Sequence, residues 1–460
     1  MLFNTTQFFV FLAVVLALFY TCPRPWRRVI LLAASYFFYM SWNVKFVLLL
    51  LTLTVIDYTA GIWIPRVRPE RRKLLLICSL SANLGFLGFF KYYNFLTDNL
   101  VALLKLPPHS FALDIILPLG ISFHTFQSMS YVVEVYRGRQ EPVRNPIDYA
   151  LFISFFPQLV AGPIVRAREF FADFYNWRAP SGEEILRGTL MVIFGLAKKM
   201  VLADQFARIA DMYFKQPSAH PGMLAAWSGV LAFSMQIYFD FSGYTDMAIG
   251  MAQILGFHFP MNFRRPYLAD SMTEFWRRWH MSLSRWLRDY LYIPLGGNRH
   301  GRLQTYRNLM LTMLLGGLWH GASWNFVVWG GYHGVLLSLE RVTDLPGRKT
   351  PLLTPLRIAI TFTLASLGWV FFRAADLPTS GYIIGQMFAG GASHMLWYGW
   401  QLWLIFSILV LTVLQEKLDW FERLITAPAW VYATVVASLL LSVELIGVSD
   451  VAVPFVYFQF

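Results

Sequence analysis

The residues best able to do chemistry lie in a glycine- and tryptophan-rich stretch, Trp319–Asn325, inside an apolar run. Its imidazole, His320, can titrate near neutral pH and accept a proton from a hydroxyl group. The glycines around it would let a ligand or another backbone approach closely. Trp319 and Asn325 are candidates to line a substrate channel. Burial alone slightly favours a structural histidine bonded to a neighbouring helix, so both interpretations stay open at this point.

His333 is a rival in the same apolar hairpin, 13 residues after His320. At about 100° per residue the two side chains would point to different faces of a helix. We therefore do not expect them to share one site as helical neighbours.

A second candidate is the segment 275–291, in which aromatic and aliphatic residues recur at helical spacing. This pattern predicts an amphipathic helix at the membrane–water boundary. His280 lies at the edge of the apolar stripe, a position that suits a side chain directed into the protein. The stripe consists of Phe275, Trp276, Trp279, Leu283, Trp286, Leu287 and Tyr290.

The other side of this predicted helix carries four guanidinium groups, which suit bidentate contacts with phosphate. They are candidates to bind a phosphate-bearing cofactor, together with Trp276 and Trp279. A plain interfacial anchor is the equally simple alternative. The four residues are Arg277, Arg278, Arg285 and Arg288.

A third candidate is a pair of carboxylates, Asp240 and Asp246, on either side of Gly243 in an apolar run. They could orient a histidine or bind a substrate hydroxyl in a channel. Alternatively they cap the ends of helices broken at Gly243, and the sequence slightly favours this structural role.

The sequence offers no ligand set for a metal ion. It lacks the paired-cysteine and HExxH patterns of zinc sites, and it also lacks GxGxxG, Walker and GxSxG motifs. Its two cysteines, Cys22 and Cys78, form no CxxC pair and lie far from the central motifs. We expect neither a bound metal nor a reactive cysteine at the central motifs.

The composition then says what kind of molecule must position these residues. Of 460 residues, 57% are hydrophobic and only 14% are charged, and the mean hydropathy is +0.50. Ordinary soluble domains carry about 25% charged residues. These values exclude a soluble enzyme, a disordered chain and a disulfide-stapled module, and they indicate an all-helical polytopic membrane protein.

Apolar runs predict about 11 spanning or re-entrant helices in a single membrane domain, residues 1–460. The run at 150–165 is short and interrupted by prolines and a glycine, which favours a re-entrant segment. The other runs are residues 1–20, 29–42, 46–64, 74–90, 111–136, 189–212, 223–259, 308–340, 356–372, 402–414 and 431–448.

The formal net charge of +12 comes from basic residues in the short loops between these runs. Such clusters indicate cytoplasmic loops, so we expect Arg24, Arg27 and Arg28 on that side of the bilayer. Nucleic-acid binding would need a basic domain face, which the sequence does not offer.

Several of these motifs together resemble the membrane-bound O-acyltransferase family, and among its members the bacterial branch that acetylates alginate. The likeness runs nearly end to end. It rests on Phe275-Trp276-Arg277-Arg278-Trp279-His280, Trp286-Leu287-Arg288-Asp289-Tyr290, Tyr292-Ile293-Pro294-Leu295-Gly296-Gly297-Asn298-Arg299, Trp319-His320-Gly321 and Phe239-Asp240-Phe241-Ser242-Gly243-Tyr244-Thr245-Asp246.

The resemblance implies a ring of tilted helices around a central funnel in a bacterial inner membrane. It implies an acetyl group drawn from cytoplasmic acetyl-CoA, with no permanently bound cofactor, and an extracytoplasmic polysaccharide acceptor reached through a periplasmic partner protein. The family's invariant histidine corresponds to His320, the expected general base. Its second histidine corresponds to His280, which would either orient His320 or donate a hydrogen bond to the developing oxyanion. The alternatives are a non-enzymatic transporter of polysaccharide or lipid-linked sugar, or the same family with a peptidoglycan, lipid or protein acceptor.

Overall fold

A computed structural model describes the chain except for residues 161, 344–350, 398, 449–454 and 457–460. All regular secondary structure in the described residues is helical, as the composition predicts. The Cα packing forms two compact units, one of Met1–Gly188 with Met247–Pro260 and one of Thr189–Asp246 with Met261–Phe460. A single membrane domain over 1–460 stays a prediction.

The first unit is built from helices near the N-terminus and a segment that follows a long central helix. Two helices, α10 (Gly182–Ala197) and α12 (Met223–Ile254), have residues in both units. The others are α1 (Thr6–Thr21), α2 (Arg24–Met40), α3 (Phe46–Trp63), α4 (Pro69–Leu87), α5 (Tyr93–Leu104), α6 (Ile121–Tyr136), α7 (Pro146–Ser154), α8 (Phe156–Leu159) and α9 (Ala167–Tyr175).

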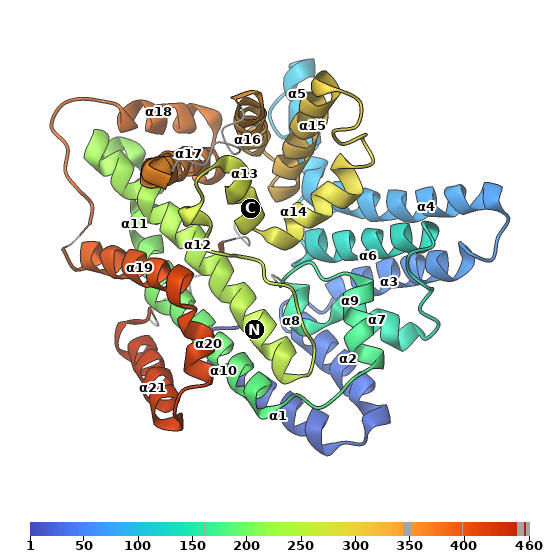
Figure 1. Cartoon of the computed structure of the whole chain (residues 1–460). Helices are drawn as coiled ribbons and strands as arrows, with labels where there is room; N and C mark the ends of the chain where they lie inside the picture. The colour runs from blue at the N-terminus through green and yellow to red at the C-terminus, as the bar shows by residue number, and fades with distance from the viewer. Residues whose placement is uncertain (161, 344–350, 398, 449–454, 457–460) are drawn as a thin grey trace. The chain divides into compact units, whose positions relative to one another are not determined.

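Helices α3, α4 and α6 lie side by side in the first unit (Figure 1). A buried carboxylate on α3, Asp57, accepts hydrogen bonds from Ser79 Oγ at 2.6 Å and from Asn83 Nδ2 at 2.9 Å, both on α4. Because a buried charged group is costly unless it is hydrogen-bonded, this set fixes the register of the two helices.

The second unit contains the rest of the chain. Its helices are α11 (Asp204–Lys215), α13 (Met272–Arg278), α14 (Met281–Leu287), α15 (Arg302–His320), α16 (Trp324–Thr343), α17 (Thr354–Arg373), α18 (Leu377–Met387), α19 (Gly399–Leu418), α20 (Trp420–Ile425) and α21 (Ala429–Ile446).

The hairpin of α15 and α16 is held together by direct backbone contact. Gly317 on α15 faces the carbonyl group of Phe326, and Gly330 on α16 faces that of Met313, with no room for a Cβ atom at either glycine. Only glycine permits two helices to approach this closely. The contact fixes the end of α15, where His320 is the last helical residue.

Four helical segments of the described chain are long and apolar enough to cross a membrane. They support a membrane protein, while the number of about 11 spans stays a prediction. The short run at 150–165 contains α7 and α8, which are separated at Phe155. The four segments are Phe46–Trp63, Pro69–Leu104, Thr354–Arg373 and Ala429–Ile446.

The prediction of one continuous helix over 275–291 is wrong. The chain breaks at Trp279 and His280 between α13 and α14, and His280 has a φ of 41°, in the left-handed region. From Arg288 the chain continues as a π-helical turn to Tyr292. The expected apolar stripe is nevertheless buried at Phe275, Trp279, Leu283, Trp286 and Leu287.

The interpretation of Asp240 and Asp246 as caps of broken helix ends is also wrong, because α12 continues through Gly243 without interruption. Gly243 is needed for a different reason. A Cβ atom there would come within 2.6 Å of the carbonyl oxygen of Gly195, so the glycine allows a close approach between helices instead of a break.

Replacing Gly330 with alanine should destabilise the α15–α16 hairpin. The new methyl group would overlap the Met313 carbonyl group, which cannot move away as a flexible side chain could. Overpacking of this kind costs about 1–3 kcal/mol. We expect a clearly lower midpoint of thermal unfolding in detergent.

Gly331→Ala is the matched control, because its Cβ atom would meet only Leu314 Cδ2 at an ordinary 3.5 Å. Its midpoint should stay near that of the wild type or rise slightly, since alanine favours helix. Equal midpoints for the two variants would contradict the proposed backbone contact.

Candidate active site

His320 lies at the C-terminal end of α15 in a pocket of aromatic rings. The residue is 5% exposed. Its ring centroid is 5.0 Å from that of Trp319, 5.0 Å from that of Trp329 and 5.1 Å from that of Phe372. The hairpin turn that follows, at Gly321–Ser323, places α16 and therefore Trp329 against the imidazole.

His280 is fully buried at the break between α13 and α14, as its place at the edge of the stripe predicts. Asn262 organises this break. Its Oδ1 accepts hydrogen bonds from Ser282 N at 3.1 Å and Ser282 Oγ at 3.0 Å, and it lies 3.1 Å from His280 Nδ1. Its backbone carbonyl accepts from Met281 N. These contacts stabilise a backbone conformation that non-glycine residues adopt at a cost.

The contact with Asn262 sets the chemistry available to His280. An amide oxygen that already accepts two hydrogen bonds requires the imidazole to donate, so Nδ1 carries the proton. Burial lowers the pKa of His280 to about 3, so the ring is neutral at physiological pH. A neutral ring with a proton on Nδ1 presents Nε2 as an acceptor.

Two tryptophans connect His280, His320 and His333. Trp319 contacts both His320 and, at 6.2 Å between centroids, His280. Trp329 contacts both His320 and, at 4.8 Å, His333. We call His280, Trp319, His320, Trp329 and His333 the histidine–tryptophan row.

Helical periodicity predicts His333 and His320 on different faces of one helix. In the structure the two residues belong to different helices, α16 and α15. The α15–α16 turn brings both against Trp329. His333 is fully buried, and neither ring nitrogen has a hydrogen-bond partner among the described residues. Its Nε2 lies where a Cβ atom on Gly368 would be 3.0 Å away.

Asn325 lies in the first turn of α16 and ties that helix to the end of α17. Its Nδ2 donates to the carbonyl oxygen of Ala374 at 2.7 Å. Its Oδ1 is buried and has no hydrogen-bond partner in the described part of the chain. One side of the amide is therefore structural, and the other could accept a hydrogen bond from a hydroxyl group.

Asp240 is a buried member of an ion-paired cluster. Lys199 Nζ lies 2.9 Å from Asp240 Oδ1 and 2.8 Å from Asp204 Oδ1, and all three side chains are almost inaccessible to solvent. The backbone N–H of Val456 donates to Asp240 Oδ2 at 2.6 Å. The carboxylate is thus fully engaged in holding α12, α11 and the C-terminal segment together.

Asp246 is engaged in the same way by the neighbouring lysine, because Lys198 Nζ lies 2.6 Å from its Oδ2. Neither Lys198 nor Lys199 is among the candidate site residues predicted from the sequence. The available signal was a pair of adjacent lysines within the apolar run 189–212, because charged residues at such depth need partners.

The four predicted cofactor-binding arginines do not lie along one continuous helix, because the chain breaks between α13 and α14. Arg277 and Arg278 both pair with Glu274, at 3.6 Å and 2.8 Å, and Arg288 pairs with Asp289 at 2.7 Å. Arg285 lies on α14 between them. Arg277 and Arg288 remain the most exposed, with 72% and 58% of their side-chain surface accessible.

The two predicted cofactor-binding tryptophans differ in their surroundings. Trp279 is 1% exposed and packs against Phe275 and Trp369. Trp276 is partly buried and contacts the rings of Trp329 and His333. Trp276 therefore joins the arginine-bearing segment to the histidine–tryptophan row.

Comparison with known proteins places this geometry in context. Residues 142–373 match the family described as MBOAT, membrane-bound O-acyltransferase family. The chain is 44% identical over 402 residues to the probable alginate O-acetylase AlgI of Pseudomonas putida, covering 85% of this chain and 81% of that protein.

Two further relatives carry other names. The chain is 41% identical to the peptidoglycan O-acetyltransferase of Helicobacter pylori, over 79% of this chain and 73% of that protein. It is 30% identical to the teichoic acid D-alanyltransferase of Bacillus subtilis, over 58% of this chain and 70% of that protein.

Removing Lys199 should strongly destabilise the second unit. Lys199→Met leaves Asp204 and Asp240 as buried carboxylates without their shared lysine partner, and breaking a buried ion pair costs about 3–5 kcal/mol. Thermal unfolding in detergent should show a large drop in midpoint. Lys215→Met is the control, because that lysine is 72% exposed and its ion pair at 3.7 Å is weak.

A rescue variant tests whether the unpaired carboxylates cause the loss of stability. Adding Asp204→Asn and Asp240→Asn to Lys199→Met removes both unpaired charges and should recover most of the lost stability. An unchanged midpoint in Lys199→Met, or no recovery in the rescue variant, would contradict the assignment of a buried charge cluster.

Proposed function

Because the chain belongs to the membrane-bound O-acyltransferase family, we propose that this membrane enzyme transfers an acetyl group from acetyl-CoA to an extracytoplasmic polysaccharide. That it is an O-acyltransferase follows from the family and its O-acetyltransferase relatives. The choice of acetyl-CoA, of a polysaccharide acceptor and of a bacterial inner membrane belongs to the proposal. The observation that carries it is the buried histidine–tryptophan row with His320 at its centre.

In the proposed reaction His320 acts as the general base. It takes the proton of the acceptor hydroxyl while the hydroxyl oxygen attacks the carbonyl carbon of the thioester. The carbon–sulfur bond then breaks, and the leaving thiolate receives that proton, giving an acetyl ester and free CoA. The aromatic rings around His320 exclude water, which would otherwise hydrolyse the thioester.

His280 supports this reaction as an acceptor. A neutral imidazole with Nδ1 bound to Asn262 cannot donate from Nε2, so stabilisation of an oxyanion by His280 is not favoured. Its Nε2 can instead accept a hydrogen bond from the attacking hydroxyl or from a group that orients His320. Asn325 Oδ1 is a second acceptor for a substrate hydroxyl.

We propose that the donor approaches from the cytoplasm, with its phosphates near Arg277 and Arg288. These two guanidinium groups are exposed enough to exchange their local carboxylate partners for phosphate. About 11 spanning or re-entrant helices around a funnel would give the donor and the acceptor access from opposite sides. A periplasmic partner protein would then complete acetylation of the polymer.

The acceptor could also be peptidoglycan, since a relative with that name aligns over 79% of this chain. Both acceptors are sugars with free hydroxyl groups, so the same base serves either. Mass spectrometry of exopolysaccharide and of cell-wall fragments from cells with and without the gene would distinguish them. A non-enzymatic transporter is not favoured, because the family and the relatives are transferases.

His320→Ala should nearly abolish acetyl transfer, because a general base contributes about 10²–10⁴-fold to the rate. The measurement is release of free CoA and acetylation of acceptor by the purified protein in detergent. His394→Ala is the matched control, because His394 is exposed and lies outside the row. A near-normal transfer rate in His320→Ala, with normal membrane insertion, would refute the role of His320.

Arg277→Gln should raise the KM for acetyl-CoA about tenfold with little change in kcat, because it removes a charged contact with phosphate and leaves the row intact. Arg66→Gln, an equal loss of charge at another exposed arginine, should leave KM unchanged. Equal KM values for the two variants would place the donor phosphates elsewhere.

A further inference from the structure

A cavity in the first unit is not used by the proposed reaction. Its volume is about 420 Å³. It lies where the end of α1, the first turns of α2, and parts of α7 and α9 meet the loop after α9. The residues that line it are Phe19, Arg24, Pro25, Arg27, Arg28, Leu31, Asp148, Phe174, Tyr175, Trp177 and Phe257.

Three arginines and one carboxylate line this cavity, so its walls carry an excess of positive charge. Arg28 Nη1 lies 3.7 Å from Asp148 Oδ1, and Tyr175 Oη donates to Asp148 Oδ2 at 3.4 Å. The carboxylate is thus partly compensated by Arg28 and Tyr175. Arg24 and Arg27 remain without a carboxylate partner among the described residues.

Arg27 is held in place by aromatic rings instead of by an anion. Its guanidinium carbon lies 4.2 Å from the centre of the Trp177 ring and 5.1 Å from that of Phe19. Its Nε and Nη1 are buried and have no hydrogen-bond partner in the described chain. Leaving charged donors unsatisfied is costly, so the arrangement favours an anionic ligand that would accept from this guanidinium.

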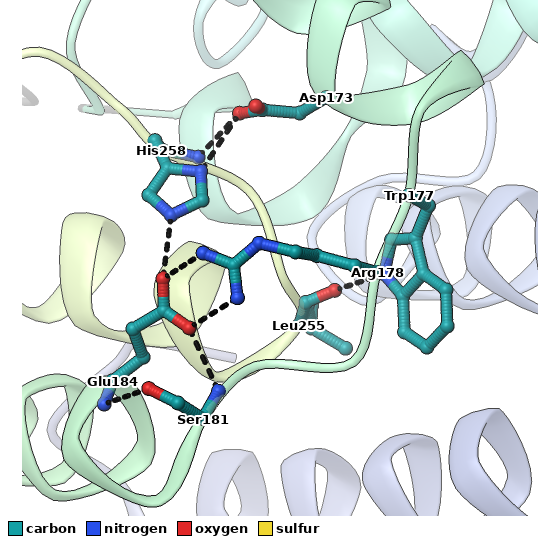
Figure 2. Close-up of polar contacts among 7 residues, drawn as sticks. All are labelled: Asp173, Trp177, Arg178, Ser181, Glu184, Leu255 and His258. Carbon is teal, nitrogen blue, oxygen red and sulfur yellow. Dashed lines mark hydrogen bonds and ion pairs between the residues drawn. The ribbon is translucent and has the colours of Figure 1, made fainter.

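A separate polar cluster fixes the wall that carries Trp177, as Figure 2 shows. Trp177 Nε1 donates to the carbonyl oxygen of Leu255 at 2.9 Å. The next residue, Arg178, donates to both carboxylate oxygens of Glu184, at 2.9 Å and 2.6 Å. Glu184 Oε2 also accepts from Ser181 N at 2.7 Å. The loop after α9 is therefore pinned at both neighbouring residues.

The second half of the cluster anchors the segment after α12 (Figure 2). The backbone N–H of His258 donates to Asp173 Oδ2 at 2.6 Å, and its ring Nε2 lies 3.2 Å from Glu184 Oε1. The hydrogen bonds from Arg178 hold the pKa of Glu184 well below its usual range. The carboxylate is thus ionised at neutral pH, and its contribution to stability is lost only as the pH falls toward the acid range.

The start of α2 adds to the positive character of the cavity. The helix begins at Arg24 after Pro23, and no side chain caps its first turn. The helix dipole at such an end favours an anion. The same basic cluster is the one that the sequence predicts at the cytoplasmic surface of the bilayer.

We propose that this cavity binds the phosphate group of an amphiphilic phosphoester. Arg27 and Arg24 would contact the phosphate, while the rings of Trp177, Phe174 and Phe257 would contact the apolar or aromatic part of the ligand. An anionic phospholipid of the cytoplasmic leaflet and a soluble phosphate-bearing nucleotide share this chemistry, and the cavity would be a second phosphate site besides the donor site proposed at Arg277 and Arg288. Basic pockets at the cytoplasmic ends of membrane helices are suited to lipid headgroups.

The test measures binding by the purified full-length protein with two probes. Native mass spectrometry in detergent gives the affinity for phosphatidylglycerol against phosphatidylcholine, and equilibrium dialysis gives the affinity for CoA. Arg27→Gln should weaken binding of at least one phosphate probe about tenfold, because a charge-assisted contact is lost. The sensitive probe identifies the source of the phosphate.

Two further variants show whether a loss of binding is specific to the cavity. Arg24→Gln removes an exposed arginine of the same cavity, should fold normally, and should weaken the same probe at least threefold. Arg71→Gln removes an exposed arginine outside the cavity and should change neither affinity by more than twofold. If neither probe is more sensitive to Arg27→Gln and Arg24→Gln than to Arg71→Gln, the proposal is overturned. Because no acetyl transfer is measured, the outcome does not depend on the role of His320.

Discussion

The backbone contact between α15 and α16 is the constraint on which the candidate active site depends. Because Gly317 and Gly330 lack side chains, the two helices pack closely enough for the last residue of α15 to face the second turn of α16. His320 and Trp329 meet there, and Trp329 in turn reaches His333. A larger residue at either glycine would separate the helices and move the imidazole relative to its aromatic surroundings.

A second constraint is that polar groups in an apolar protein must find partners within it. Asn262 satisfies the backbone and side chains at the break before α14, and this allows His280 to adopt its left-handed conformation. Lys199 compensates Asp204 and Asp240, which ties α11 and α12 to the C-terminal segment. These polar sets therefore fix the backbone around His280 and the packing of α12 within the second unit.

Prediction from the sequence is correct for features that one residue type determines, such as fold class and burial. Apolar runs and composition predict an all-helical membrane protein, and the aromatic stripe of 275–291 correctly predicts buried Phe275, Trp279 and Leu283. Prediction from the sequence is wrong where the course of a helix depends on a residue far away in the chain. The break at His280 needs Asn262, 18 residues away, and the uninterrupted helix through Gly243 reflects its close approach to Gly195. Periodicity within one segment predicts neither the contact of His280 with Asn262 nor that of Gly243 with Gly195. The catalytic assignments themselves stay predictions until the variants are measured.

The arginines show why charge patterns alone do not identify an anion site. Arg277 and Arg288 fall in a conspicuous motif, yet each has a carboxylate partner within 4 Å, so a phosphate group would have to displace Glu274 or Asp289 there. Arg27 belongs to a basic cluster that the sequence marks only as a topology signal, but the fold places it in the first turn of α2, on Trp177 beside a cavity. Whether an arginine can bind phosphate depends on which acceptors the fold has already supplied, and for Arg27 the described structure supplies aromatic faces and no anion.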